Sequence, residues 1–280
     1  MLDAGVVRGL VAAQFPRWAG LPVAPVESSG TDNHVYRLGD GLSVRLPRVE
    51  YAVAQLDLER RWLPVLAPHL AAEVPDPLAL GAPALGYPYA WGVYRWLDGT
   101  VPDDPGAIAH DLADFVLALR RIGTAGGPRV QPDGRGASLR GRDVGEAIAR
   151  LARDYDPARL EAVWERDRAA PEWDGPPVCV HGDLHAANLL ARGGRLSAVL
   201  DWSFLALGDP AVDLMPAWLA FGPAARAAFP ARVDPDPATW RRGRAWAFSF
   251  GLGGLAHYRH TNAYFADLGR LAIDQVLAEA

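Results

Sequence analysis

The chain carries the segment Val178-Cys-Val-His-Gly-Asp-Leu-His-Ala-Ala-Asn-Leu-Leu190, and Leu200-Asp201-Trp202 follows shortly after it. Asp183 and Asn188 stand five positions apart in one predicted loop, and Asp201 stands at the end of a short predicted strand. Two carboxylates and an amide oxygen are ligands that suit hard cations such as Mg²⁺. Phosphoryl transfer uses such a set, because one carboxylate accepts a hydroxyl proton while the metal neutralises phosphate charge. The segment therefore predicts a site for phosphoryl chemistry.

Protein kinases have the same spacing in their catalytic loop, His-Arg-Asp followed by four residues and Asn. Residues 181–188, together with Leu-Asp-Trp at 200–202 and Gly-Asp-Pro-Ala-Val-Asp-Leu at 208–214, resemble the aminoglycoside phosphotransferases and related small-molecule kinases. Upstream, Asn-His-Val-Tyr-Arg at 33–37 and Ser-Val-Arg-Leu-Pro-Arg at 43–48 are similar to two strands of that family. The resemblance covers nearly the whole chain, and its most specific part is the catalytic segment.

The resemblance implies an α+β, protein-kinase-like bilobal fold. In that fold a small, β-rich N-terminal lobe lies over a larger, mainly helical C-terminal lobe, and the nucleotide binds between them. We expect the nucleotide-binding lobe to span residues 1–97. The catalytic and substrate-binding lobe is then expected to span residues 98–280.

The resemblance also implies roles for individual residues. Asp183 corresponds to the catalytic base, and Asn188 and Asp201 correspond to the ligands of Mg²⁺. Glu59 corresponds to the helix glutamate that pairs with a strand lysine, but Arg45 stands where the family usually carries that lysine. A guanidinium can contact the α- and β-phosphates and pair with Glu59 without losing its charge. We therefore expect Arg45 and Glu59 to act with Asp183 at the catalytic centre.

A turn and a hinge complete the nucleotide site that the resemblance implies. The turn at residues 28–33 corresponds to the phosphate-covering loop, although it has one glycine where protein kinases have G-x-G-x-x-G. Backbone N–H groups and small side chains would then bind the phosphates. The strand at residues 93–97 corresponds to the hinge between the lobes, with the Arg95 carbonyl and the Leu97 amide facing adenine. The expected nucleotide-binding residues are Ser28, Ser29, Gly30, Thr31, Asn33, Arg45, Arg95 and Leu97.

Several polar residues also fit a different role. Asp and Asn commonly cap helices and form turns, and capping of a helix start explains Asp209 and Asp213. The pattern H-x-D-x-H at residues 181–185 could instead bind a transition metal, although no further His stands nearby and the neighbouring Cys179 lies in an apolar predicted strand. The acidic residues between Asp154 and Asp174 could contact the amino groups of a cationic substrate, as in the resembling family, or form a solvated helix face.

Hydrophobic patterns predict the elements around these motifs. Helices are expected over 6–15, 52–66, 105–122, 143–154, 157–168 and 239–257, and the second is expected to end or kink near Trp62 because Pro64 follows. Strands are expected over 23–28, 34–38, 42–46, 89–97, 177–180 and 196–200. Helices are expected to dominate from residue 210 onward.

The composition excludes several other classes of protein. Of the 280 residues, 50% are hydrophobic and 22% are charged, as in a globular protein with a core. No apolar run is long enough to span a membrane and no signal sequence is visible, so we expect a cytoplasmic protein. A net charge of −5 without a basic tract argues against nucleic acid as a partner. The single cysteine excludes an intrachain disulfide, and the absence of lysine excludes Schiff-base chemistry and a Walker-A loop.

We therefore expect an enzyme, a nucleotide-dependent small-molecule O-phosphotransferase. The resemblance implies that it uses Mg²⁺ with ATP or GTP, and that its acceptor is a cationic aminoglycoside-type antibiotic, with resistance as the outcome. A metabolite kinase of the homoserine, choline or sugar type and a macrolide kinase share the same nucleotide machinery and stay open. A pseudokinase that binds nucleotide without transfer is the non-enzymatic alternative, supported by Arg45 alone. A monomer is expected, because no heptad pattern predicts assembly.

Overall fold

A five-stranded antiparallel sheet forms the N-terminal part of the chain in the computed structural model, which describes residues 2–27, 30–123 and 126–279. The strands lie in the order β1-β2-β3-β5-β4, so β3 is central. Their bounds are β1 (Val23–Pro25), β2 (Asn33–Leu38), β3 (Leu42–Pro47), β4 (Pro77–Gly81) and β5 (Trp91–Arg95). The β2–β3 hairpin forms around the turn that the sequence predicts.

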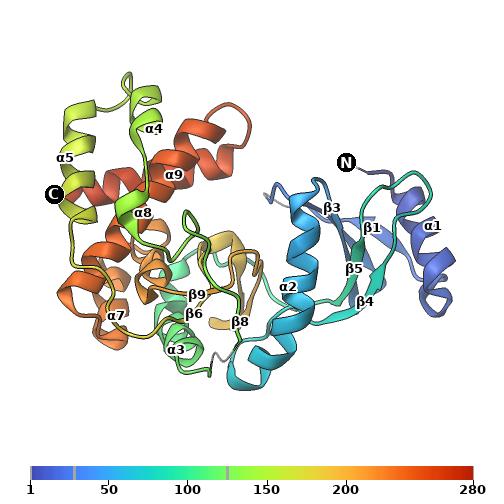
Figure 1. Cartoon of the computed structure of the whole chain (residues 1–280). Helices are drawn as coiled ribbons and strands as arrows, with labels where there is room; N and C mark the ends of the chain where they lie inside the picture. Colours follow the sequence, from blue (N-terminus) through green and yellow to red (C-terminus); the bar gives the residue numbers. More distant parts are fainter. Residues whose placement is uncertain (1, 28–29, 124–125, 280) are drawn as a thin grey trace.

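The two faces of this sheet carry different helices, because side chains alternate along each strand. Tyr36 and Leu46 are buried on one face and pack with Leu10 of α1 (Ala4–Gln14). Arg45, the neighbour of Leu46 on β3, lies on the other face, beside Glu59 of α2 (Tyr51–Leu66). Figure 1 shows α1 and α2 on opposite sides of the sheet. The face with α2 therefore carries the charged groups and is turned toward the rest of the chain.

Of the two outcomes predicted near Trp62, an end or a kink, the end is wrong, because helix α2 continues through Pro64. A proline removes one backbone donor and crowds the preceding turn. Because Pro64 stands in the last turn, only the hydrogen bond to the carbonyl of Arg60 is lost. Leu63 and Leu66 are buried in the core of the helical part. Burial of each leucine contributes about 2 kcal/mol, which offsets that loss.

The C-terminal part is mainly helical, and Figure 1 shows its helices around two short sheets. The small sheets pair β6 (Val178–Val180) with β9 (Ala206–Gly208), and β7 (Leu189–Arg192) with β8 (Arg195–Val199). Their connecting loops contain Asp183, Asn188 and Asp201. The helices are α3 (Ala109–Arg120), α4 (Gly145–Arg150), α5 (Pro157–Arg168), α6 (Pro216–Leu219), α7 (Pro223–Val233), α8 (Pro237–Tyr258) and α9 (Ala263–Ala278).

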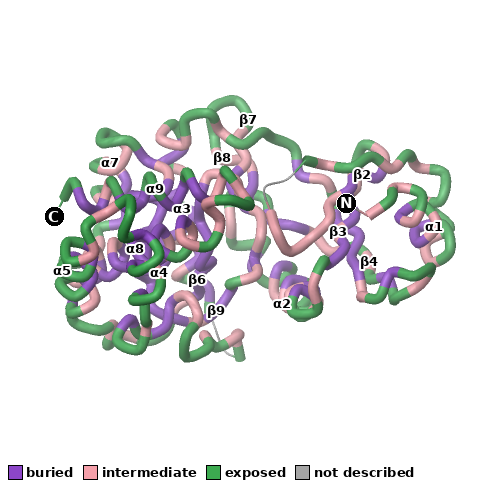
Figure 2. The backbone as a smooth tube through the Cα atoms, turned by 90° about the horizontal axis from the view of Figure 1, so that it is seen from above, coloured by how far each residue is buried: buried purple, intermediate pink, exposed green. Residues whose placement is uncertain are grey.

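Two hydrophobic cores hold these parts together. The larger core fills the helical part, and the smaller lies between α1 and the sheet; Figure 2 shows the corresponding buried segments at either end of the molecule.

Helices α8 and α9 approach closely at Gly251 and Gly269. A Cβ at Gly269 would lie 2.8 Å from the carbonyl oxygen of Gly251 and 2.7 Å from the amide nitrogen of Leu255. Only glycine allows this separation.

Several element boundaries differ from the predicted ones. The helix expected over 105–122 begins as a 3₁₀ turn, Pro105–Ile108, before α3, and the helix expected over 143–154 shortens to α4. Strands β4, β7 and β9 were not predicted, because β4 lies in a proline-rich stretch and the others are very short. No helix in the described ranges combines the length and the hydropathy that a membrane-spanning segment needs.

Candidate active site

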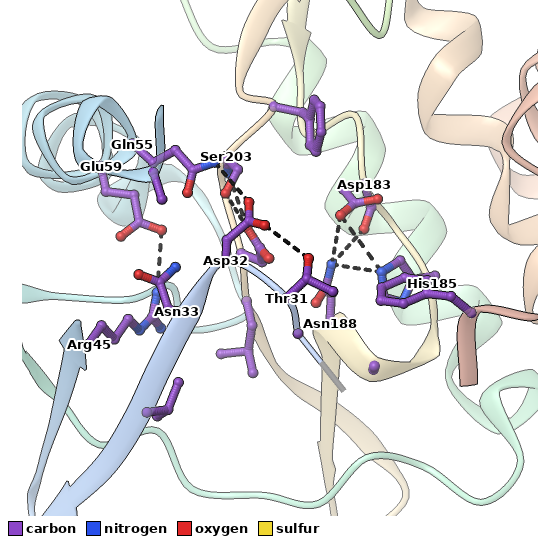
Figure 3. A pocket seen from close by; sticks show the side chains of 18 of the residues that line it. Thr31, Asp32, Asn33, Arg45, Gln55, Glu59, Asp183, His185, Asn188 and Ser203 are labelled. Carbon is purple, nitrogen blue, oxygen red and sulfur yellow. Dashed lines mark hydrogen bonds and ion pairs between the residues drawn. The ribbon is translucent and has the colours of Figure 1, made fainter. Parts of the chain in front are cut away.

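A cavity of about 940 Å³ opens between the sheet and the helical part. Arg45 and Glu59 reach it from the side of the sheet, and Asp183 and Asn188 reach it from the other side, as Figure 3 shows. Asp201 also lines this cavity. The structure thus brings together, in one cavity, the five residues that the sequence assigns to catalysis and metal binding.

The loop that follows β6 is held by a buried carboxylate. Asp213 accepts hydrogen bonds from the backbone amides of His181 (2.9 Å) and Gly182 (2.8 Å). The His181 ring is buried, and its Nε2 lies 3.0 Å from the carbonyl oxygen of Leu200. Burial lowers the pKa of His181 and raises the pKa of Asp213. Asp213 therefore supports the loop that carries Asp183, whereas capping of the adjacent 3₁₀ turn falls to Asp209.

Asp183 is buried among three polar side chains. One carboxylate oxygen accepts a hydrogen bond from Arg135; the other lies 3.3 Å from Asn188 Nδ2 and 3.7 Å from His185 Nε2. Burial would raise the pKa of this carboxyl, but Arg135 and His185 together outweigh burial and hold the pKa well below its usual range. Asp183 is therefore ionised and can accept a hydrogen bond from a hydroxyl group in the cavity.

Arg135 belongs to this site although no motif predicts it. It stands in the loop between α3 and α4, and its guanidinium also donates to the carbonyl oxygen of Gly182 at 3.0 Å. The Cζ atom lies 3.9 Å from the centre of the Phe204 ring. The loop is rich in glycine and shows no hydrophobic periodicity, so nothing in the local sequence except the charge of Arg135 indicates that it belongs to the site. Its position depends on long-range packing.

Asn188 is oriented by hydrogen bonds of its Nδ2 to Asp183. It ends the 3₁₀ turn Ala186–Asn188, and its Nδ2 donates to the carbonyl oxygen of Asp183 at 2.9 Å. Within the described part of the chain, no hydrogen bond uses its Oδ1. His185 supports this turn, since its Nδ1 lies 3.0 Å from the hydroxyl of Tyr264, whose pKa burial raises to about 12. The Oδ1 atom is therefore available to a cation.

Asp201 follows β8 in a left-handed backbone conformation with a φ of +57°. Aspartate and asparagine tolerate this conformation better than most residues. The neighbouring Trp202 is fully buried and donates to the carbonyl oxygen of Val199 at 3.0 Å, which anchors the turn. Asp201 Oδ1 accepts hydrogen bonds from the hydroxyl and the amide of Ser203. Among the residues that the structure describes, none donates to its Oδ2, which is therefore available for a second metal contact.

Arg45 and Glu59 form the ion pair that the sequence predicts. Arg45 Nη1 lies 3.3 Å from Glu59 Oε1, and the arginine Cζ lies 4.5 Å from the centre of the Tyr94 ring. Glu59 is buried, and burial raises its pKa while Arg45 opposes the rise. The stacked guanidinium is thus held at the wall of the cavity with a fixed orientation.

Removing Arg45 is expected to destabilise the fold as well as the site. Arg45→Met leaves the buried Glu59 carboxylate without its cation, and loss of one partner of such a pair costs about 3 kcal/mol. Urea denaturation should show this fall in the free energy of unfolding, whereas Arg48→Met, at an exposed position just after the same strand, should leave it nearly unchanged. An equal stability for both variants would contradict a structural contribution of the pair.

The predicted phosphate-covering turn is described in part. Ser28 and Ser29 lie outside the described residues, whereas Gly30, Thr31 and Asn33 line the cavity. Asp32 ties the turn to α2, because its carboxylate accepts hydrogen bonds from Tyr51 Oη (2.8 Å) and Gln55 Nε2 (3.3 Å). Figure 3 shows Asp32 and Gln55 together at the rim of the site. The turn is therefore fixed to the same helix that carries Glu59.

The predicted hinge also lines the cavity. Arg95, Trp96 and Leu97 connect β5 to the helical part, and all three border the cavity. The amides of Arg95 and Trp96 donate to the carbonyl oxygens of Asp76 and Gly41. No such bond within the described residues uses the amide of Leu97. Leu97 N–H is therefore available to a ligand in the cavity.

Two alternative interpretations of the sequence lose support. The described residues contain no group of three His, Cys, Asp or Glu side chains that could hold a metal ion, so the H-x-D-x-H pattern does not form a transition-metal site. The acidic residues between 154 and 174 do not line the cavity. Asp154 pairs with Arg259, Asp167 with Arg244 and Glu172 with Arg140, so their charges are neutralised elsewhere.

Comparison with known sequences gives a family and several curated relatives. The model of a family described as the phosphotransferase enzyme family matches residues 24–246. The uncharacterized protein YcbJ of Bacillus subtilis (strain 168) is 27% identical over 199 residues, which are 64% of this chain. The match spans 63% of the length of that relative.

Solved structures confirm the expected fold. The GDP complex of wild-type aminoglycoside 2'-phosphotransferase-IIIa superposes with a TM-score of 0.74 at 17% identity, covering 99% of both chains. The complex of a related APH(2") enzyme with GDP and kanamycin gives the same TM-score and identity, covering 98% of this chain and 99% of the other. Macrolide 2'-phosphotransferase MphH from Brachybacterium faecium gives a TM-score of 0.66 at 25% identity, covering 97% of this chain and 98% of that enzyme. The α+β, protein-kinase-like architecture is therefore shared.

Proposed function

Because this chain belongs to the phosphotransferase enzyme family, we propose that it transfers the γ-phosphoryl group of ATP or GTP to a hydroxyl of a small molecule. The observation that carries the proposal is the convergence of Asp183, Asn188, Asp201 and Arg45 on one cavity. We place the boundary between a nucleotide-binding lobe, residues 1–97, and a catalytic lobe, residues 98–280, after residue 97. The adenine ring would then contact Leu97 N–H and the Arg95 carbonyl.

The residues of the chain divide the work of transfer among themselves. Asp183 accepts the hydrogen bond of the acceptor hydroxyl and takes its proton as the bond from the acceptor oxygen to the γ-phosphorus forms. The bond from the γ-phosphorus to the bridging oxygen breaks, and the nucleoside diphosphate leaves with that oxygen. Arg45, oriented by Glu59, holds the α- and β-phosphates. Charge stabilisation and alignment supply nearly all of the catalysis in such reactions.

The donor set suits Mg²⁺ with a nucleotide. Asn188 Oδ1 and Asp201 Oδ2 are oxygen atoms without hydrogen bonds in the described chain, and both residues border the cavity. Mg²⁺ typically takes one or two protein oxygens and completes its shell with phosphates and water. When bound, the ion neutralises phosphate charge. The buried Asn33 Oδ1, which has no partner within the described residues, is a further polar atom that a ligand at the turn can satisfy.

The acceptor class is a separate question from the reaction. An aminoglycoside-type antibiotic is the class that the structures with GDP and kanamycin support, and the likeness to MphH supports a macrolide. Metabolites of the homoserine, choline or sugar type remain alternatives with the same nucleotide chemistry. A non-catalytic nucleotide-binding protein is disfavoured, because the pKa of Asp183 is held low and Asn188 and Asp201 line the same cavity, as a transfer site would need.

A direct assay tests the proposed reaction. Purified protein is incubated with Mg-ATP or Mg-GTP and one member of an acceptor panel, and the phosphorylated product is identified by mass spectrometry and ³¹P NMR. Transfer to at least one hydroxyl, dependent on Mg²⁺, is the expected result. Tight binding of Mg-nucleotide without transfer to any acceptor would favour the pseudokinase alternative.

A larger side chain at Gly253 is expected to fill the part of the cavity where we place the acceptor. Gly253 of α8 lines the cavity, and a Cβ there would meet no atom within 4 Å. Gly253→Leu is expected to raise the KM for the acceptor at least tenfold, while the melting temperature rises or stays constant, because glycine costs a helix about 1 kcal/mol. Gly253→Ala, which adds one carbon, should change KM much less. Equal KM values for both variants would show that the acceptor binds elsewhere.

A further inference from the structure

Beyond Asp183, the cavity continues to a wall of aromatic side chains. Trp246 and Phe250 of α8 line it, together with Phe204 from the loop before β9. Phe204 is 39% exposed, although large aromatic residues are usually covered. An apolar surface of this kind binds the ring or chain of a ligand and makes few demands on its polar groups.

Arg142 lines the same wall and lacks a carboxylate partner. Its Nε donates to the hydroxyl of Ser249, one Nη donates to the carbonyl oxygen of Asp133 at 3.3 Å, and its Cζ lies 4.9 Å from the centre of the Trp246 ring. No ion pair within the described residues involves Arg142, and its Nη2 has no hydrogen bond there. A guanidinium that is fixed by a stacking ring and two acceptors presents its remaining N–H groups in a defined direction.

The surroundings of Arg142 compensate its charge only in part. Burial lowers the pKa of Arg142 and the nearby Arg135 guanidinium lowers it further, while the Asp133 carboxylate, which forms no ion pair with Arg142, opposes this fall without reversing it. Arg135 itself already forms an ion pair with Asp183. An anion from outside the chain would relieve both effects, and carboxylates and phosphates match the fork of an arginine.

Glu27, Asp32 and Glu59 line the cavity from the side of the sheet, but on the side of the helical part the lining contains little that could neutralise a polycation. From residue 98 onward, the described acidic residues that border the cavity are Asp183 and Asp201, and both belong to the transfer site. No acidic residue of the described 154–174 stretch lines the cavity. A molecule with several ammonium groups would therefore meet Arg135 and Arg142 without matching carboxylates, and like charges at close range cost affinity.

We propose that the acceptor carries an anionic group, a carboxylate or a phosphate, which binds Arg142 while its apolar body lies against Trp246 and Phe250. The proposal rests on the phosphotransferase function proposed above and names the acceptor class of that same site. The acceptor hydroxyl then lies at Asp183, and the space beside Gly253 receives the rest of the molecule.

The test pairs every anionic acceptor with a neutral counterpart. 3-Phenyllactate and medium-chain ω-hydroxyalkanoates are compared with their methyl esters, and glucose 6-phosphate is compared with glucose, in the transfer assay with Mg-ATP and Mg-GTP. Kanamycin and erythromycin represent the cationic and the macrolide classes. At least one anion is expected to exceed its neutral partner in kcat/KM by roughly 10-fold to 100-fold, the range of a hydrogen bond to a charged group. The carboxylate and phosphate arms identify which anion the site prefers.

Variants at two neighbouring arginines provide the matched control. Arg142→Met is expected to bring the ratio between anion and neutral partner close to one, mainly through KM, and Arg142→Lys should restore part of it. Arg140→Met changes an exposed arginine that does not line the cavity, and it should keep the wild-type ratio. If Arg142→Met does not fold, the ratio measured on the wild-type chain still decides.

The possible failures are distinguishable. Preference for kanamycin or erythromycin over every anion, equal rates for each anion and its neutral partner, or nucleotide hydrolysis without transfer to any anion overturns the anionic acceptor and leaves nucleotide chemistry in place. A chain that neither binds nor hydrolyses Mg-nucleotide contradicts the proposed function itself, and the acceptor class falls with it.

Discussion

Asp183→Asn is expected to lower kcat by about three orders of magnitude. The amide keeps the size and the hydrogen bond to Arg135 but cannot take the proton of the acceptor hydroxyl, and loss of a positioned general base costs roughly 10²-fold to 10⁴-fold. Because the proposed site puts the acceptor hydroxyl at Asp183 and the adenine at Leu97, the Kd for nucleotide should change little. The effect is therefore expected in kcat and not in nucleotide affinity.

Single-turnover measurements with a good acceptor check this expectation, and fluorescence titration with a nucleotide analogue measures binding in parallel. Asp57→Asn, at a well exposed position of α2, is the matched control and should keep wild-type turnover. Turnover of the Asp183 variant within tenfold of the wild-type value would remove Asp183 as the base.

Asp201→Asn is expected to give the second largest loss, about 10²-fold in kcat/KM. Asparagine tolerates the left-handed backbone that Asp201 adopts, so the turn and its hydrogen bonds to Ser203 can persist. The variant removes one negative charge from the predicted metal site, and a contact to a charged group contributes about 1.5–3 kcal/mol. The Mg²⁺ concentration for half-maximal rate should rise with it.

A titration of the rate with Mg²⁺ separates this effect from misfolding. The loss should shrink as Mg²⁺ increases, and circular dichroism should show an unchanged helix content. Asp209→Asn is a useful contrast, since Asp209 is buried and pairs with Arg242 at 2.6 Å. That variant should lose stability without a change in the Mg²⁺ requirement. An Mg²⁺ dependence identical to the wild type would exclude Asp201 as a ligand.

The parts of the site that could be predicted are those in which chemistry and local sequence coincide. Asp183 and Asn188 share one loop, and the residues between them are enough to predict a turn. Arg45 and Glu59 come from a strand and a helix with clear patterns, and the family resemblance implies their pairing.

The unpredicted parts depend on contacts between distant segments. Arg135 and Arg142 lie in a loop without periodicity, and only the packing of that loop against α8 brings them to the cavity. Asp154 and Asp167 show the opposite case, because their charges look available in sequence and are neutralised by arginines far along the chain. Strand β4 was missed since proline argued locally against it, whereas pairing with β5 supplies its hydrogen bonds.

The glycine contact between α8 and α9 has a consequence for how this protein could acquire new acceptors. Gly251 and Gly269 let the backbones of α8 and α9 come into contact, and α8 also carries Trp246 and Phe250, which line the cavity. The contact between the two helices, which does not itself line the cavity, therefore fixes where the aromatic wall stands. A single methyl group at Gly269 would wedge the helices apart and shift the aromatic wall. Substitutions at this helix contact can therefore change which acceptors bind, while the residues proposed to bind phosphate and metal keep their identity.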